Sequence, residues 1–104
     1  MASARGRLRS GRDAPAAGEK VVAVAAVKGA VVEQILSGRL DGPVAYRQDV
    51  DEWVVVLEGG AVLDVGDEIV RLGPGDWLLL PAGTAHRLVE TTPGTSWLTV
   101  TATA

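Results

Sequence analysis

Turn-forming residues recur at short intervals through this chain and leave only brief apolar runs between them. Glycine and proline together make up 18 of the 104 residues. The segments between turn signals that are expected to form strands hold about four to seven residues each. A globular helix needs about ten or more residues with a 3.6-residue apolar period, and these runs are too short for one. Short strands with a turn signal about every eight to twelve residues are typical of an all-β sandwich or barrel.

The clearest expected strand is Trp53–Leu57, where three valines follow a tryptophan. β-Branched and aromatic residues of this kind fit a pleated, half-buried surface. The segment 44–48 is short and forms either an edge strand or an extended loop. The expected strands are residues 21–27, 30–36, 44–48, 53–57, 61–65, 69–72, 77–80, 86–90 and 96–101.

Nearly continuous apolar strands predict burial on both faces, or an outer face that a partner covers. Homodimerisation through an exposed sheet is therefore expected. Trp53, Trp77 and Trp97 are expected in the core or in such an interface, with ligand stacking as the less common role for each.

The charge is unevenly distributed along the chain. The net charge is −3, but residues 1–12 contribute +4 and the remainder −7. We expect residues 1–19 to form a disordered basic tail and residues 20–104 to form one domain. The tail could be a nucleic-acid arm, a membrane-surface arm or a transit peptide, although a solvated end is commoner. The acidic domain argues against a nucleic-acid partner.

Two absences from the sequence bear on the compartment. The chain contains no cysteine, so it has no disulfide framework. No apolar run approaches the roughly 18 residues of a membrane span. We therefore expect a cytoplasmic protein without a membrane partner.

The stretch 73–88 has the most specific pattern and contains the single histidine of the chain, His86. Gly75, Pro81, Gly83 and His86 follow one another at fixed spacings around one short apolar run. Pro81 cannot donate to a strand ladder and Gly83 permits a sharp bend, so the chain turns just before His86. This turn would direct His86 back towards the interior.

These four positions resemble the second sequence motif of the cupin superfamily. The resemblance implies a small antiparallel double-stranded β-helix, or jelly-roll barrel, in which this histidine points inwards and binds a metal. Glu52 and Gly59, seven residues apart, are similar to the end of the first cupin motif. The two regions together span about residues 46–90.

The first motif departs from the family pattern where cupins carry two histidines. Those positions hold Tyr46 and Gln48, or Ala45 and Arg47 with a longer spacing. The run from Tyr46 to Trp53 resembles a subgroup of small cupins with a degenerate first metal motif. The resemblance implies the barrel more firmly than any activity.

The departure changes the metal chemistry that the chain can support. Gln48, Glu52 and His86 would offer one imidazole, one carboxylate and one weak amide oxygen. Imidazoles favour zinc, iron, nickel and copper, whereas oxygen ligands favour harder ions such as manganese or magnesium. The sequence predicts either no metal or a weakly bound divalent ion of unknown identity.

Each candidate residue also has a purely structural interpretation. His86 could form a hydrogen bond inside the barrel, with Glu52 as its partner, or the two could act as an acid–base pair. Tyr46 could line the barrel mouth, while Asp49 and Asp51 fit a solvated loop. Arg47 and Arg87 are out of phase with the inward positions and should face outwards.

Three functions remain open at this point. The first is a barrel that binds a small molecule among Tyr46, Gln48, Glu52 and His86, without a strong catalytic metal. The alternative is a metal-dependent dioxygenase, isomerase or lyase with Glu52 and His86 as ligands. A third is a barrel that serves protein association. Whether the chain is an enzyme stays undecided, because one fold hosts many functions.

Overall fold

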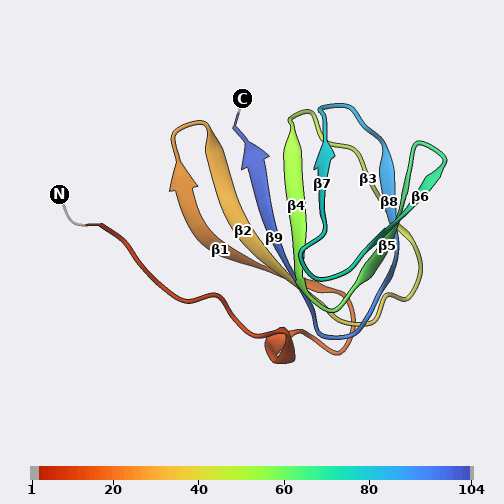
Figure 1. Ribbon diagram of the computed structural model, residues 1–104, viewed down its shortest axis with the longest axis horizontal. Coiled ribbons are helices and arrows are strands. Elements are labelled where there is room, and N and C mark those ends of the chain that lie inside the picture. The colour runs from red at the N-terminus through yellow and green to blue at the C-terminus, as the bar shows by residue number, and fades with distance from the viewer. Residues whose placement is uncertain (1–2, 104) are drawn as a thin grey trace.

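The computed structural model describes residues 3–103, which form two antiparallel β-sheets that face each other (Figure 1). The all-β prediction is confirmed, and each expected strand is present with its ends shifted by two residues or fewer. In spatial order, the first sheet consists of β1 (Glu19–Val27), β2 (Ala30–Ser37), β9 (Thr95–Ala102), β4 (Glu52–Glu58) and β7 (Trp77–Leu80). The second consists of β3 (Val44–Tyr46), β8 (His86–Thr91), β5 (Ala61–Val65) and β6 (Glu68–Leu72).

Strand alternation explains which side chains enter the space between the sheets. On β4, Val54 and Val56 are 5% and 0% exposed, whereas Val55 between them points to the other face. The core between the sheets is apolar and is completed from β5, β6, β8 and β9. Its buried members are Val54, Val56, Ala61, Leu63, Leu72, Leu88 and Trp97.

Two tight turns set the register of the strands around the core. Gly66 and Asp67 join β5 to β6 and have φ of 53° and 69°, as a type I′ hairpin turn requires. Gly83 has φ of 80° in the turn between β7 and β8, where the Thr84 amide donates to the Pro81 carbonyl at 3.1 Å. This second turn begins β8 at His86, as the sequence predicts.

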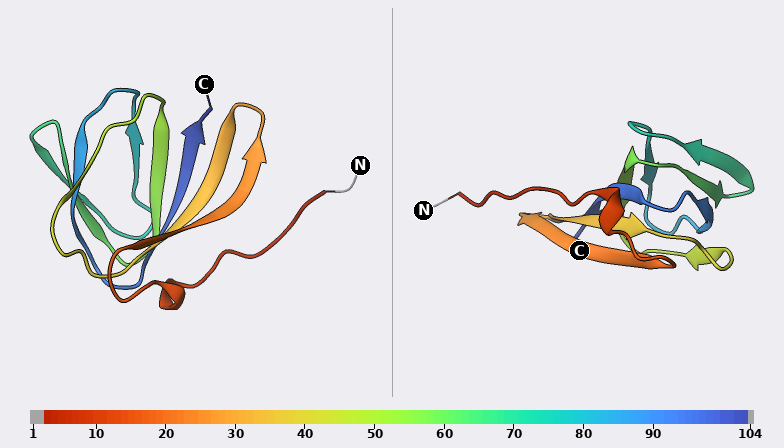
Figure 2. Two further views of the ribbon diagram at one scale, coloured as in Figure 1. Left: turned by 180° about the vertical axis from the view of Figure 1, so that it is seen from behind. Right: turned by 90° about the horizontal axis from the view of Figure 1, so that it is seen from below.

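The chain before β1 contacts the first sheet. A single 3₁₀ turn, Gly11–Asp13, lies beneath the strands, and the residues before it run outwards (Figures 1 and 2). The main chain of Arg9 exchanges two hydrogen bonds with the side chain of Gln34, at 2.9 and 2.8 Å. The Gly11 amide donates to Glu58 at 2.9 Å. These contacts show where residues 9–11 meet the barrel. The expected division into a disordered tail and one domain stays a prediction.

The outer face of the first sheet is apolar around β4 and β7. Trp77 and Leu79 are 60% and 54% exposed, and the rings of Trp53 and Trp77 lie 6.3 Å apart. Trp97, in contrast, is in the core, which is one of the roles expected for the tryptophans. Trp77 is too exposed for the core, and its expected interface role stays a prediction. In residues 3–103, no helix is long and apolar enough to cross a membrane.

Candidate functional site

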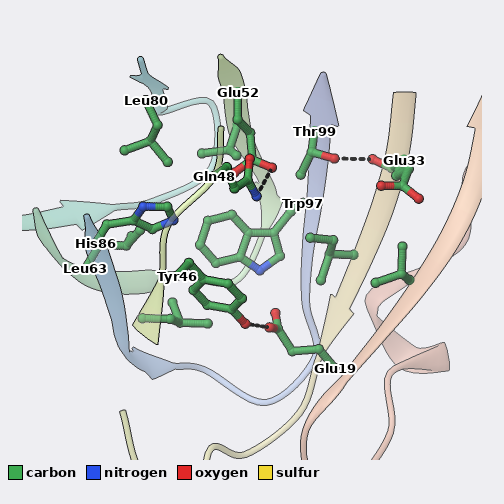
Figure 3. A pocket seen from close by; sticks show the side chains of 14 residues that line it. Glu19, Glu33, Tyr46, Gln48, Glu52, Leu63, Leu80, His86, Trp97 and Thr99 are labelled. Atoms are coloured by element: carbon green, nitrogen blue, oxygen red, sulfur yellow. Dashed lines mark hydrogen bonds between the residues drawn. The ribbon is translucent and has the colours of Figure 1, made fainter. Parts of the chain in front are cut away.

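A cavity of about 250 Å³ lies between the two sheets (Figure 3). Its walls are mainly aliphatic and aromatic, and its polar groups come from both sheets and from the loop before β4. The lining residues are Glu19, Val21, Glu33, Ile35, Tyr46, Gln48, Glu52, Val54, Leu63, Leu80, His86, Leu88, Trp97 and Thr99. An apolar cavity with a few polar anchors is the usual form of a small-molecule site.

The four residues that the sequence singles out all line this cavity. Tyr46 ends β3, Glu52 begins β4 and His86 begins β8, while Gln48 lies in the loop before β4. The Gly83 amide holds that loop by donating to the Gln48 carbonyl at 2.7 Å. The structure brings the four side chains to one space, and their role in binding stays a prediction.

His86 is 7% exposed and stacks on Tyr46, with ring centroids 5.6 Å apart and an angle of 18° between the planes. Its Nδ1 lies 3.2 Å from the Thr84 carbonyl oxygen, which can only accept a hydrogen bond. Nδ1 is therefore placed to donate, and in a neutral ring this tautomer leaves Nε2 as an acceptor. The ring points into the cavity (Figure 3).

The hydrogen bond considered between His86 and Glu52 is not among the bonds of residues 3–103. Glu52 Oε2 instead accepts from Gln48 Nε2 at 3.0 Å and from Thr101 at 3.3 Å. The other polar atom of this amide, Gln48 Oε1, is buried, and within the described chain it has no hydrogen-bond partner. A buried acceptor without a partner is unusual in a folded protein.

Glu19 anchors a second hydrogen-bond network on the opposite wall. Its two carboxylate oxygens accept from the Tyr46 hydroxyl and from Ser37 Oγ, each at 2.8 Å. Ser37 Oγ in turn accepts from Trp97 Nε1 at 3.0 Å. Burial, followed by the hydrogen bond and the charge of Glu19 and the charge of Glu52, raises the pKa of Tyr46 well above its ordinary value of 10.0.

Sequence reasoning missed Glu19, Glu33 and Thr99 as cavity residues. The predicted tail ended at Glu19, whereas β1 begins there and places Glu19 and Val21 on the same face. Glu33 and Ile35 line the cavity together for the same reason, two residues apart on β2. A search for polar residues two positions from inward apolar ones could have found both glutamates.

Known proteins share both the sequence pattern and the fold. The family model described as "Cupin domain" matches residues 31–101, more than half of the chain. The chain is a cupin. A solved protein of Ralstonia eutropha, provisionally assigned as a mannose-6-phosphate isomerase, is 32% identical with a TM-score of 0.75, and the match covers 88% of this cupin and 93% of that chain. A cupin superfamily protein of Desulfitobacterium hafniense is 20% identical with a TM-score of 0.67 over 88% and 84% of the two chains, which shows the fold alone.

Curated relatives match over a shorter length. The 3-hydroxyanthranilate 3,4-dioxygenase of Rattus norvegicus is 42% identical over 64 residues, which are 62% of this cupin and 21% of the relative. The human enzyme of the same name is 44% identical over 55 residues, 53% of this cupin and 19% of the relative. This cupin thus spans about a fifth of the length of these relatives.

Cupins typically bind a divalent metal ion through side-chain ligands. In residues 3–103, no group of three His, Cys, Asp or Glu side chains is placed to hold a metal. The polar atoms on offer are His86 Nε2, a Glu52 oxygen and the unpartnered Gln48 Oε1. One imidazole with two oxygen donors is a poor fit to a tightly held iron or zinc ion, which favours several nitrogen or sulfur ligands.

Tyr46 should resist ionisation in the folded cupin. Because the folded pKa is raised, the stability that Tyr46 contributes is complete below about pH 10 and is lost as the pH rises above it. Tyr46 is the single tyrosine of the chain, so tyrosinate absorbance in the near ultraviolet reports on it alone. We expect a midpoint above that of free tyrosine, which Glu19→Gln moves part of the way down. A midpoint at the free-tyrosine value would contradict the network.

Proposed function

We propose that this cupin binds a small molecule in the cavity between its sheets and holds no strong catalytic metal. The observation that carries the proposal is His86 Nε2, which faces the cavity and is left as an acceptor when Nδ1 donates to the Thr84 carbonyl (Figure 3). Gln48 and Glu52 add polar groups to the same wall. The volume of about 250 Å³ limits the ligand to a small one.

The alternative function is a metal-dependent enzyme of the dioxygenase, isomerase or lyase type. The names of the relatives favour it, since they include a dioxygenase and a provisionally assigned isomerase. Glu52 and His86 would then be ligands, and Gln48 Oε1 a third, weak one. Such a site would hold a divalent ion loosely, and the ion would supply Lewis acidity to a substrate in the cavity.

The substrates in those names match this cavity poorly. 3-Hydroxyanthranilate carries a carboxylate and mannose 6-phosphate a phosphate. The described residues that line the cavity include Glu19, Glu33 and Glu52 but neither lysine nor arginine. Anions are usually bound by arginine, lysine or clustered backbone amides. The acidic lining therefore favours a ligand that is neither 3-hydroxyanthranilate nor mannose 6-phosphate.

Replacing His86 separates the two functions. His86→Ala should weaken binding of a fragment found by ligand-detected NMR by about tenfold, because it removes one acceptor and part of the wall. The metal content should stay well below one equivalent in both proteins. Arg87→Ala is the matched control, because Arg87 follows in sequence, pairs with Asp64 at 2.7 Å and lies largely outside. Unchanged fragment binding in His86→Ala, or loss of a full metal equivalent, would overturn the binding proposal.

We also propose that the cupin forms a homodimer through the outer face of its first sheet. Trp53, Val55, Trp77 and Leu79 form an uncharged patch there, paired across β4 and β7. A patch of this kind is more typical of an interface between copies than of a solvent-facing sheet. Leu79→Glu should convert a dimer to a monomer in light scattering, while Ile69→Glu, at the similarly exposed Ile69 of β6, should not. A wild-type monomer at high concentration would contradict this.

A further inference from the structure

The donors in the cavity wall are already engaged by the protein. The Tyr46 hydroxyl donates to Glu19 at 2.8 Å, and Trp97 Nε1 donates to Ser37 at 3.0 Å. Thr99 Oγ1 donates to the main-chain oxygen of Glu33 at 3.4 Å (Figure 3). Gln48 Nε2 donates one of its two N–H groups to Glu52. Within the described chain, a bound molecule would therefore find all of these donors occupied except the second N–H group of Gln48.

Acceptors, in contrast, remain available to a ligand. His86 Nε2 is an acceptor when the neutral ring donates from Nδ1 to Thr84. Among the described residues, Glu52 Oε1 and the Glu33 carboxylate accept no hydrogen bond from a side chain or the main chain. The free hydrogen-bonding capacity of the cavity is thus almost entirely that of an acceptor, so the complementary ligand is a donor.

Charge favours the same kind of ligand. Three carboxylates line the cavity, and no lysine or arginine is among the described lining residues. Carboxylates at the edge of an apolar space act in a lower dielectric than water, so their attraction for a cation is strengthened there. Tyr46 and Trp97 line the same space, and aromatic side chains attract ammonium groups.

We propose that the ligand of this cavity is a small organic amine in its cationic form. The proposal rests on the proposed small-molecule function and names its ligand class. The ammonium group donates to His86 Nε2 and the free Glu52 oxygen, while the apolar part lies against Leu63, Leu80 and Leu88. Glu33 supplies negative charge without a competing protein donor. Carboxylates and phosphates are disfavoured, because they meet acceptors and like charges.

The test compares three probes of similar shape: benzylamine, benzyl alcohol and benzoate. Each is titrated at neutral pH and low salt in the presence of EDTA, and binding is followed by calorimetry and by the NMR signals of the Gln48 amide and the Trp97 indole. We expect benzylamine to bind at least about tenfold more tightly than benzoate, with benzyl alcohol between them. Raising the salt concentration should narrow the difference.

Two variants locate the source of the preference. Glu33→Gln keeps the side-chain volume and removes one charge from the wall, so it should reduce the preference for benzylamine severalfold. Glu90→Gln removes a charge from an exposed position of β8 and should leave the preference unchanged. Equal effects of the two variants would overturn the assignment to the cavity, because they would show a response to net charge alone.

The other outcomes have distinct meanings. Benzoate binding as tightly as benzylamine would overturn the amine proposal but leave the small-molecule function standing. No response to any of the three probes would overturn the amine proposal and count against the small-molecule function as well. Mn²⁺ is titrated separately without EDTA. Tight Mn²⁺ binding with no benzylamine binding would assign the acceptors to a metal ion and overturn the amine proposal.

Discussion

Trp97→Ala is expected to lower the free energy of unfolding by about 3–5 kcal/mol. Trp97 is 4% exposed on β9, packs in the core between the sheets and lines one wall of the cavity. Truncation removes its aromatic contacts and enlarges a cavity that already exists. It also removes the donor to the fully buried Ser37 Oγ. The loss is measured by urea denaturation followed by circular dichroism.

Ile69→Ala is the control for this prediction. Ile69 is 55% exposed on β6, outside the patch proposed as the dimer interface, so its truncation should cost less than about 1 kcal/mol. If Trp97→Ala does not fold, Trp97→Phe retains most of the apolar volume and supplies the measurement, with a smaller loss. Similar losses for Trp97→Ala and Ile69→Ala would contradict the assigned positions of the two side chains.

Glu19→Ala is expected to destabilise the fold by about 2 kcal/mol. It leaves the Tyr46 hydroxyl and Ser37 Oγ without the acceptor that each has at 2.8 Å. Loss of one partner from a buried polar pair costs about 1–3 kcal/mol, and Tyr46 retains some access to water. Glu19→Gln preserves one acceptor oxygen and should cost less. Thermal unfolding monitored by circular dichroism gives the order of the three proteins.

A double-mutant cycle isolates the Glu19–Tyr46 bond. Glu19→Ala combined with Tyr46→Phe should destabilise by less than the sum of the two single changes, with a coupling of about 1 kcal/mol. Glu33→Ala is the control, because Glu33 lines the same cavity and its carboxylate has no hydrogen bond within the described chain. It should change stability by less than about 0.5 kcal/mol. An equal loss in Glu19→Ala and Glu33→Ala would argue against the network.

Much of the fold could be predicted because each strand is short and ends at a chemically explicit turn. Gly66-Asp67 and Pro81-Ala82-Gly83 punctuate the chain where the structure turns. The resemblance to the two cupin motifs implied that Glu52 and His86 point inwards, and both line the cavity. Alternation placed Arg87 on the outer face, where it is exposed. These are local features, and local sequence patterns report them well.

The remainder of the site depends on contacts between distant segments. Glu19 meets Tyr46 across 27 positions and Trp97 meets Ser37 across 60, and neither pairing leaves a periodic signal in the sequence. The hydrogen bond considered between His86 and Glu52 depends on such distant contacts too, and both residues have other partners in the structure. Glu52 is held by Gln48, four residues away in the adjoining loop, and by Thr101 on a neighbouring strand, while His86 contacts Thr84 in its own turn.

This cupin retains the inward histidine of the second motif and replaces the two histidines of the first. Tyr46 and Gln48, at those two positions, take different roles in the structure. Tyr46 joins the network of Glu19, whereas Gln48 lines the cavity and donates to Glu52. The replacement exchanges nitrogen donors for a phenol and an amide, which suits recognition of an organic ligand better than retention of a transition metal.

Elemental mass spectrometry of the purified full chain tests directly whether this cupin holds a strong metal ion. The protein is prepared without chelator and without metal-affinity resin, alongside His86→Ala and Arg87→Ala. We expect well below one equivalent of iron, zinc, manganese or nickel per chain in all three proteins, including after incubation with these ions and desalting. One equivalent in the wild type and in Arg87→Ala, lost in His86→Ala, would contradict this expectation and establish a metal centre at His86.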